Sequence, residues 1–455
     1  MKSTHSKVIY SKIKDFKFRN ETFLIVIAPL LLGLILWLFR KESLLSSLYS
    51  WFNMNAKGAD SWMPMKMALD HIASSNDLLY QELFFKGKLK FQYPPTSLLL
   101  HKFLIFISIS PTVGFFNAVN WFLVLTNSLL ASILGVRLAA HLRNNTLGSY
   151  ECIAISALCF LACLLFYPIL KAYTLGQAQV WINVLFAMAC VGWFYEKKYL
   201  TGAVIGLICL IKPQFSLFFL WSLIRGQKKF LGGWLSSVLP GLAISVFLFG
   251  LNNHIDYLTV LGALSKAGES YFPNQSVNGL LNRLLDNGSV IVWEANAFPP
   301  YNAIVRWGTL VSSGIIISIA LLYGRNRKPT LLEFQLAGLA FTMASPIAWE
   351  HHYGILPLIF ISVYFELQHF NNNKRRKFYY LILSISYVLS ANFLGTIYRI
   401  SESPLNIIYS YLFFGSAILI FLLYILIESL NQKNWRMALK SGLLPDSPEL
   451  MKKCI

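Results

Sequence analysis

This sequence contains few charged residues. Only 13% of its 455 residues are Asp, Glu, Lys or Arg, whereas about a quarter are charged in soluble globular proteins. Hydrophobic residues make up 56%, and the apolar segments recur along the whole chain with no soluble-looking block between them. The composition therefore excludes an ordinary soluble protein and predicts an all-α, polytopic membrane protein with one integral domain over residues 1–455.

The sequence also lacks the patterns of a disulfide-rich or metal-binding protein. Its six cysteines include no CxxC pair, and none lies in the long polar loops. No His/Cys spacing is typical of a zinc site, so we expect neither a metal nor another cofactor. The first apolar segment has no small-residue cleavage site and is expected to be an uncleaved span.

Acidic residues are scarce: 20 Asp and Glu stand against 39 Lys and Arg, for a net charge of +19. In a soluble protein this excess would indicate nucleic acid. Here the cations collect in short loops, where they set topology and meet anionic lipids. We therefore expect membrane lipids, and no nucleic acid, as partners.

About ten apolar runs reach the length of a membrane span. Their approximate bounds are 22–40, 113–136, 151–168, 178–195, 232–251, 303–323, 331–349, 353–369, 379–396 and 408–429. A further apolar stretch at 200–225 is broken by Lys212-Pro213. Each half is too short to span, which predicts a broken helical hairpin that enters and leaves on one side.

The distribution of Lys and Arg predicts a cytoplasmic N-terminus and a cytoplasmic tail at 430–455. This topology is consistent if the segment after Tyr93-Pro94-Pro95 lies as an interfacial helix instead of spanning. The long outer loops are then 41–112, with interfacial helices, and 252–302. Polar residues within apolar sequence mostly face this outer side, which predicts one outward-facing polar cavity.

Two charged residues are candidates for chemistry. Asp60, in the first outer loop, is placed to act as a general base, although a solvated loop aspartate is the commoner interpretation. Lys212 lies within an apolar hairpin, so the sequence places it at membrane depth. Insertion of a lysine at the centre of a membrane helix costs roughly 2.5–3.5 kcal/mol. Either it binds an anion such as a phosphate, or it extends to the interface.

Amide and imidazole side chains form a second group of candidates. Gln177 follows Gly176, which allows close backbone approach, and amides there suit either sugar hydroxyls or helix capping. Asn274 and Gln275 fit hydrogen bonding to a substrate or capping of their own loop. His351 and His352 lie about 100° apart on a helix and so do not form a shared metal site. At least one is expected to face the cavity, the alternative being an interfacial cap between two spans.

These motifs, in this order, resemble glycosyltransferase family 87, the polyprenyl-phosphate-mannose-dependent enzymes with the GT-C membrane fold. The matching pieces are the Asp60 loop, Phe91-Gln92-Tyr93-Pro94-Pro95, Leu175-Gly176-Gln177, Ile211-Lys212-Pro213, Asn274-Gln275-Ser276 with Gly279-Leu280, and Ser345-Pro346 leading to Trp349, His351 and His352. They cover residues 58 to 357. The sequence departs from the family pattern in two places: no tyrosine lies close after Asp60, and Gln177 is followed by Ala178-Gln179. These differences bear on the identity of the acceptor and of the sugar rather than on the reaction type.

The resemblance implies a metal-independent, inverting transfer of a hexose from a polyprenyl-phosphate donor to a lipid or glycan acceptor. Mannose is the family default and arabinofuranose an alternative. Asp60 would be the base. The donor phosphate and sugar would contact a group of five: His351, His352, Lys212, Gln177 and Arg399. Tyr93, Asn274 and Gln275 would make acceptor or loop contacts.

The expected location is a bacterial inner membrane, with the site facing the exterior. Two other functions stay open from sequence. One is a transporter or flippase, although the chain shows no internal repeat. The other is a surface-polysaccharide ligase or polymerase that uses a lipid-diphosphate donor.

Overall fold

The structure is a computed structural model. It describes residues 43–440 apart from 57, 144–146, 325–327, 371–372 and 395–399, together with a few residues between 27 and 38. The helices are α2 (Leu44–Phe52), α3 (Trp62–Ser74), η1 (Gln81–Lys86), η2 (Pro95–Leu98), α4 (Leu99–Phe106), α5 (Val113–Leu142), α6 (Ser149–Leu164), α7 (Tyr167–Thr174), α8 (Gln179–Phe194), α9 (Lys198–Ile211), η3 (Pro213–Ser216), α10 (Leu217–Ile224), α11 (Lys228–Phe249), α12 (Leu251–Ala267), α13 (Val277–Leu284), α14 (Ala303–Leu322), α15 (Leu331–Met343), η4 (Glu350–Ile355), α16 (Leu356–Glu366), η5 (Leu367–His369), α17 (Asn373–Ala391), η7 (Pro404–Ser410) and α18 (Tyr411–Lys440). The described residues form no strand, so the predicted all-helical class is confirmed.

Several of these helices are long and apolar enough to cross a membrane, which indicates a membrane protein. Four qualify by length and composition: α5, α11, α14 and the continuous helical run Pro404–Leu430. A fifth span results if α6 and α7, which meet at a 53° bend, are counted together. At 1.5 Å per residue, helices of about 20 residues match a hydrocarbon core of about 30 Å.

Within the described residues, four or five helical segments qualify as full spans, so the ten predicted from the sequence are not confirmed. The segments expected at 178–195, 331–349 and 353–369 are the shorter helices α8, α15 and α16. Helix α15 ends early because Pro346 follows it and disfavours helical backbone in the residue before it. The tight helix η4 then occupies the next six residues. The first expected span, 22–40, lies mostly outside the described residues.

The predicted break at Lys212-Pro213 is present in the structure. Helix α9 ends at Ile211, and Lys212 is extended at φ −125°, ψ 100°, as expected for a residue that precedes proline. Helices η3 and α10 continue the chain with only 12 residues between Pro213 and Ile224. Each arm is too short to cross a membrane by itself, and Lys212 lies at the tip between them.

Close glycine contacts show how this hairpin is held. Gly202, early in α9, lies so near Phe230, early in α11, that an added Cβ would be 1.9 Å from the Phe230 carbonyl oxygen. Gly241, late in α11, faces Leu210 at the end of α9. The two helices therefore run parallel, and α10 must run back between their ends. Small residues permit such close helix packing.

Aromatic rings and one buried ion pair attach the hairpin to the rest of the bundle. Trp221 of α10 packs on Trp193 of α8 with ring centroids 5.5 Å apart, and Phe218 of α10 packs on Phe334 of α15 at 5.3 Å. Arg225, which follows α10, donates to the Glu333 carboxylate at 2.9 Å with both side chains buried. These contacts fix the base of the hairpin and thereby the position of its tip.

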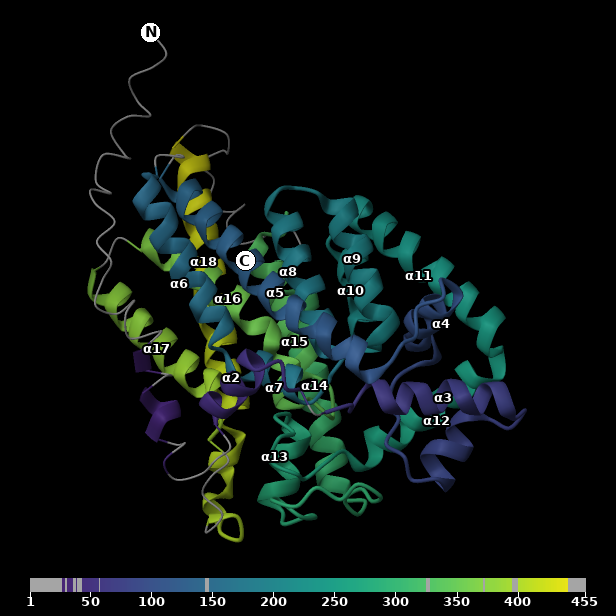
Figure 1. Cartoon of the computed structure of the whole chain (residues 1–455). Coiled ribbons are helices and arrows are strands. Elements are labelled where there is room, and N and C mark those ends of the chain that lie inside the picture. The colour runs from purple at the N-terminus through teal and green to yellow at the C-terminus, as the bar shows by residue number, and fades with distance from the viewer. Residues whose placement is uncertain are drawn as a thin grey trace, which may run out of the picture.

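The helices of the two long loops gather at one end of the molecule. Figure 1 shows α2, α3, α12 and α13 in its lower part, beside α7. Lys90 of the first loop forms an ion pair with Glu269 of the second at 2.9 Å. The backbone N–H of Tyr80 donates to the Asp256 carboxylate at 2.9 Å. The loops are thus joined by buried polar contacts and are positioned as one layer.

Candidate active site

The Asp60 loop lies against the loop that follows α7. The backbone N–H of Gly58 donates to the Thr174 carbonyl at 3.1 Å, and that of Asp60 donates to the Leu175 carbonyl at 3.0 Å. Helix α3 begins two residues after Asp60. This short ladder of backbone bonds holds the carboxylate next to the N-terminus of α8, although 117 residues separate Asp60 from Gln177.

Glycine is required where these two loops meet. Gly176 has a φ of +63°, and a Cβ added there would lie 2.1 Å from the carbonyl oxygen of Gly58. The close backbone approach that the sequence predicts at Gly176 is therefore confirmed, and its partner is the Asp60 loop.

Substitution of Gly176 by alanine is expected to destabilise the protein more than the same change at Gly226. Both glycines have φ near +60°, but nothing lies within 4 Å of a Cβ at Gly226. Gly226→Ala should therefore cost only the left-handed backbone penalty of about 1–2 kcal/mol. Gly176→Ala adds a clash with the Gly58 backbone. Thermal unfolding in lipid nanodiscs measures both; equal midpoints would contradict the loop contact.

The Asp60 carboxylate is accessible but largely surrounded by protein. Partial burial raises its pKa above the ordinary value, and two groups oppose this rise: a hydrogen bond from Gln177 and the positive charge of Lys171. Gln177 Nε2 donates to Asp60 Oδ2 at 3.4 Å. A carboxylate with a raised pKa is a stronger base while it still ionises near neutral pH.

Tyr93 and Gln177, both predicted site residues, meet beside Asp60. The Tyr93 hydroxyl donates to Gln177 Oε1 at 3.0 Å and lies 2.8 Å from Ser61 Oγ. Ser61 was not singled out from the sequence, since a serine that follows a loop aspartate carries no motif. It is fully buried, and its hydroxyl takes part in three hydrogen-bond contacts.

The structure distinguishes the two histidines. Their rings lie at 90° with centroids 4.7 Å apart, in the tight helix η4. His352 Nδ1 accepts a hydrogen bond from the Trp349 backbone at 3.2 Å, which is the capping role. His351 is buried, and its Nε2 has no hydrogen-bond partner among the described residues. His351 Nε2 is therefore free to bind a ligand, and the only hydrogen bond of the His352 ring among the described residues uses Nδ1.

Lys212 belongs to the same neighbourhood. Its side chain is buried, and Nζ has no hydrogen-bond partner in the described part of the chain. Burial lowers the pKa of both His351 and His352, and the charge of Lys212 lowers them further. The charge of Lys171 acts on Asp60 and also on His351. The sequence gives no sign of this twofold electrostatic effect, because Lys171 stands there as an isolated outer-loop lysine.

Other buried amides line the same region. Gln179 and Asn183 face each other on α8, with Gln179 Nε2 donating to Asn183 Oδ1 at 2.8 Å. Gln179 Oε1 and Asn183 Nδ2 have no partner within the described residues. Gly354 of η4 packs on Asn183, because a Cβ there would lie 2.2 Å from Asn183 Nδ2. Free donors and acceptors therefore lie where α8 meets η4.

Asn274 and Gln275 lie in a different environment and bind backbone. Asn274 Oδ1 accepts from the Ala348 N–H at 2.9 Å, and its Nδ2 donates to the Pro346 carbonyl at 3.1 Å. Gln275 Nε2 donates to the Tyr409 carbonyl at 2.6 Å. Both side chains are fully buried. These contacts are those of loop capping, the alternative that the sequence leaves open for this pair.

Two further residues complete the comparison with the sequence. Glu350 is buried and accepts a hydrogen bond from the Tyr411 hydroxyl, so it ties η4 to α18. Arg399 lies outside the described residues. Among the residues that are described, no group of three or more His, Cys, Asp or Glu side chains is placed to hold a metal ion.

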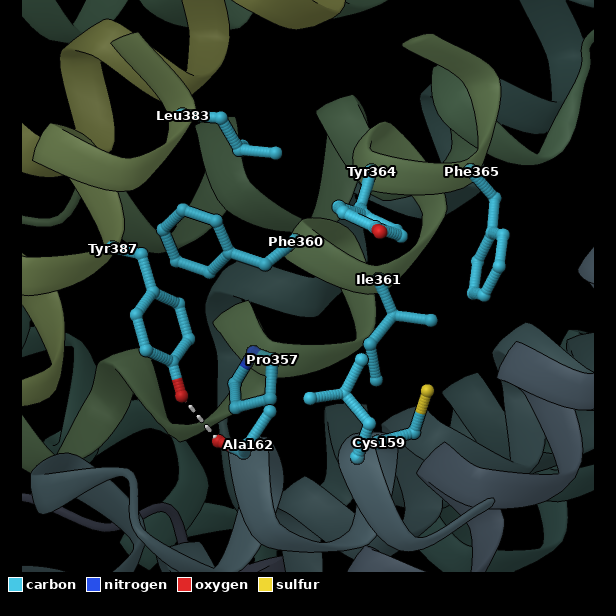
Figure 2. Close-up of a pocket in the computed structure, with 10 residues that line it drawn as sticks. Cys159, Ala162, Pro357, Phe360, Ile361, Tyr364, Phe365, Leu383 and Tyr387 are labelled. Atoms are coloured by element: carbon cyan, nitrogen blue, oxygen red, sulfur yellow. Dashed lines mark hydrogen bonds between the residues drawn. The ribbon is translucent and has the colours of Figure 1, made fainter. Parts of the chain in front are cut away.

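A separate apolar cavity of about 40 Å³ lies between α6, α16 and α17 (Figure 2). It is lined by Leu158, Cys159, Ala162, Pro357, Phe360, Ile361, Tyr364, Phe365, Leu383 and Tyr387. The Tyr387 hydroxyl is occupied by the Ala162 carbonyl at 2.6 Å. A cavity this small and apolar has no room or polar groups for a sugar, so it is distinct from the polar cluster around Asp60.

The fold and the polar cluster define a helical membrane protein with an accessible carboxylate, a buried lysine and a buried histidine near one end. The model of the family described as glycosyltransferase family 87 matches residues 91–346, which is more than half of the chain. The protein belongs to this family, and the family indicates a glycosyltransferase that uses sugar donor and acceptor substrates. The match includes Tyr93, Gln177 and Lys212, whereas Asp60 lies well before its first residue and His351 shortly after its last. No curated protein and no solved structure matches the chain.

Proposed function

We propose that this protein transfers a hexose, by default mannose, from a polyprenyl-phosphate donor to a lipid or glycan acceptor. The site lies on the outer face of a bacterial inner membrane within a GT-C-type fold. The observation that carries the proposal is the presence of an accessible carboxylate, Asp60, and of two buried groups that have no partner in the described residues, Lys212 Nζ and His351 Nε2, with Lys171 acting on both Asp60 and His351. The family membership supports the sugar transfer itself.

The unpartnered lysine suits an anionic leaving group. A buried ammonium with no counterion is costly, and a phosphate offers the charge and the oxygen atoms that would satisfy it. His351 Nε2 lies within the influence of Lys212 and can donate to the same phosphate or accept from a sugar hydroxyl. The Gln179 and Asn183 amides supply further donors and acceptors for sugar hydroxyls.

The reaction is a single displacement. Asp60 takes the proton of the acceptor hydroxyl as its oxygen attacks the anomeric carbon of the donor. The bond from that carbon to the phosphate oxygen breaks, and its electron pair leaves with the polyprenyl phosphate. Lys212 stabilises the negative charge that develops on this phosphate. The configuration at the anomeric carbon is inverted, because attack and departure occur on opposite faces.

A direct assay with defined substrates tests the proposal. Purified protein in nanodiscs receives polyprenyl-phosphate mannose labelled in the sugar, together with a lipid extract as acceptor pool. We expect label to move to an acceptor while polyprenyl monophosphate is released in equal amount. In a parallel reaction with a diphosphate-linked sugar donor, transfer and release of a lipid diphosphate, with no transfer from the monophosphate donor, would favour the ligase or polymerase. In sealed proteoliposomes, label that stays on its carrier and crosses the bilayer would favour a flippase.

A further inference from the structure

Three side-chain oxygens converge beside Asp60. Ser61 Oγ lies 2.8 Å from the Tyr93 hydroxyl and 2.8 Å from Gln177 Oε1. The Tyr93 hydroxyl lies 3.0 Å from the same Gln177 oxygen. Ser61 Oγ also accepts the backbone N–H of Ala178 at 2.9 Å. The Gln177 carbonyl oxygen therefore lies within hydrogen-bond distance of two hydroxyl groups, which share two hydrogens among the three contacts, and both Ser61 and Gln177 are buried.

These contacts decide which way the Gln177 amide faces. With Oε1 toward Ser61 and Tyr93, Nε2 points to Asp60 Oδ2 at 3.4 Å. The reversed amide would place an oxygen against the carboxylate and an NH₂ group against Ser61 Oγ, which already accepts from Ala178. The first orientation gives the Asp60 carboxylate a donor and the two hydroxyl groups an acceptor, whereas the reversed one sets two oxygens against each other at Asp60.

We propose that Tyr93 and Ser61 are positioning residues, which act through the Gln177 amide to orient the Asp60 carboxylate for proton abstraction. Neither hydroxyl hydrogen-bonds to Asp60, and neither is assigned contact with the reacting atoms. The inference rests on the proposed function of Asp60 as the base. Tyr93, which the sequence predicts to contact the acceptor substrate or its own loop, is here proposed to hold the Gln177 amide that orients Asp60.

The charges around Asp60 set the direction of the effect. Among the described residues, the titratable groups that face it are Lys171 from α7 and Tyr93 from the loop before η2. Burial raises the pKa of Tyr93 to about 12, so this phenol keeps its proton and acts as a donor. The hydrogen bond from Gln177 lowers the pKa of Asp60. Loss of that bond raises the pKa of Asp60, and the active carboxylate form then requires a higher pH.

The test is the pH dependence of hexose transfer by Tyr93→Phe in nanodiscs. The phenylalanine keeps the ring and removes only the hydroxyl. We expect the acid limb of kcat/KM to move up by roughly 0.5–1 pH unit, the usual scale for one hydrogen bond to a carboxylate. Activity should fall about three- to tenfold on the acid side and largely recover at high pH, with the donor KM unchanged. Ser61→Ala should move the limb in the same direction.

Tyr257→Phe is the matched control. The Tyr257 hydroxyl holds the same turn by donating to the Gln92 carbonyl at 3.1 Å, but it does not contact Gln177. We expect no shift of its acid limb. A uniform loss across all pH values in Tyr93→Phe, or an equal shift in Tyr257→Phe, would overturn the positioning role. Failure of the base assignment itself would appear separately, as near-normal transfer by Asp60→Asn.

Discussion

Replacement of Asp60 by asparagine is expected to lower the rate of hexose transfer by about 10²–10⁴, the range attributed to a general base. Asparagine has nearly the shape of aspartate but cannot take the acceptor proton. The backbone bond from Asp60 N–H to Leu175 is retained, so the loop should keep its position. We therefore expect the loss in kcat, with little change in donor KM or in thermal midpoint. Steady-state kinetics with labelled donor provide the measurement.

Asp70→Asn is the matched control for this prediction. Asp70 lies on α3 in the same loop, but it is exposed and forms a surface ion pair with Lys66 at 2.7 Å. Exposed pairs of this kind contribute little, and we expect its transfer rate to equal that of the wild type. Asp60→Glu keeps the carboxylate but displaces it by one methylene, and should retain part of the rate. Near-normal turnover by Asp60→Asn would remove Asp60 as the base.

Replacement of Lys212 by methionine is expected to reduce kcat/KM for the donor by about 30-fold or more. Loss of one charged partner from a buried ion pair costs about 2–5 kcal/mol, and the bound phosphate would be the partner left without it. Methionine has a similar length and no charge. Because Lys212 Nζ has no partner among the described residues, the donor-free variant should be as stable as the wild type or more so.

Two measurements distinguish loss of the phosphate contact from a general loss of folded protein. Addition of donor should raise the thermal midpoint of the wild type, because a ligand that binds only the folded state stabilises it. The Lys212→Met variant should show no such rise, and Lys212→Arg should keep part of it. Lys66→Met removes an exposed lysine and should behave as the wild type. A donor-induced rise in Lys212→Met equal to that of the wild type would contradict the phosphate contact.

Several features of the fold follow from local sequence signals. The helical class, the break at Lys212-Pro213 and the non-spanning segment after Tyr93 depend on apolar run length and on proline, both of which act within a few residues. The α4 helix after Pro95 is short, as expected. The number of full spans could not be predicted from the apolar runs, because the runs at 331–349 and 353–369 also fit two short helices joined by η4.

The sequence by itself determined that this is a helical membrane protein that resembles glycosyltransferase family 87. It also identified Asp60, Gln177, Lys212 and His351 as candidate site residues. The tertiary structure alone decided which of them are neighbours. Asp60 reaches Gln177 through a glycine contact between loops more than 100 residues apart. The tertiary structure also showed that His352 Nδ1 and Asn274 Oδ1 accept hydrogen bonds from backbone N–H groups, whereas His351 Nε2 has no partner among the described residues. Hydrogen-bond partners distant in sequence settle such roles, because each polar group is satisfied by whatever the packing places beside it.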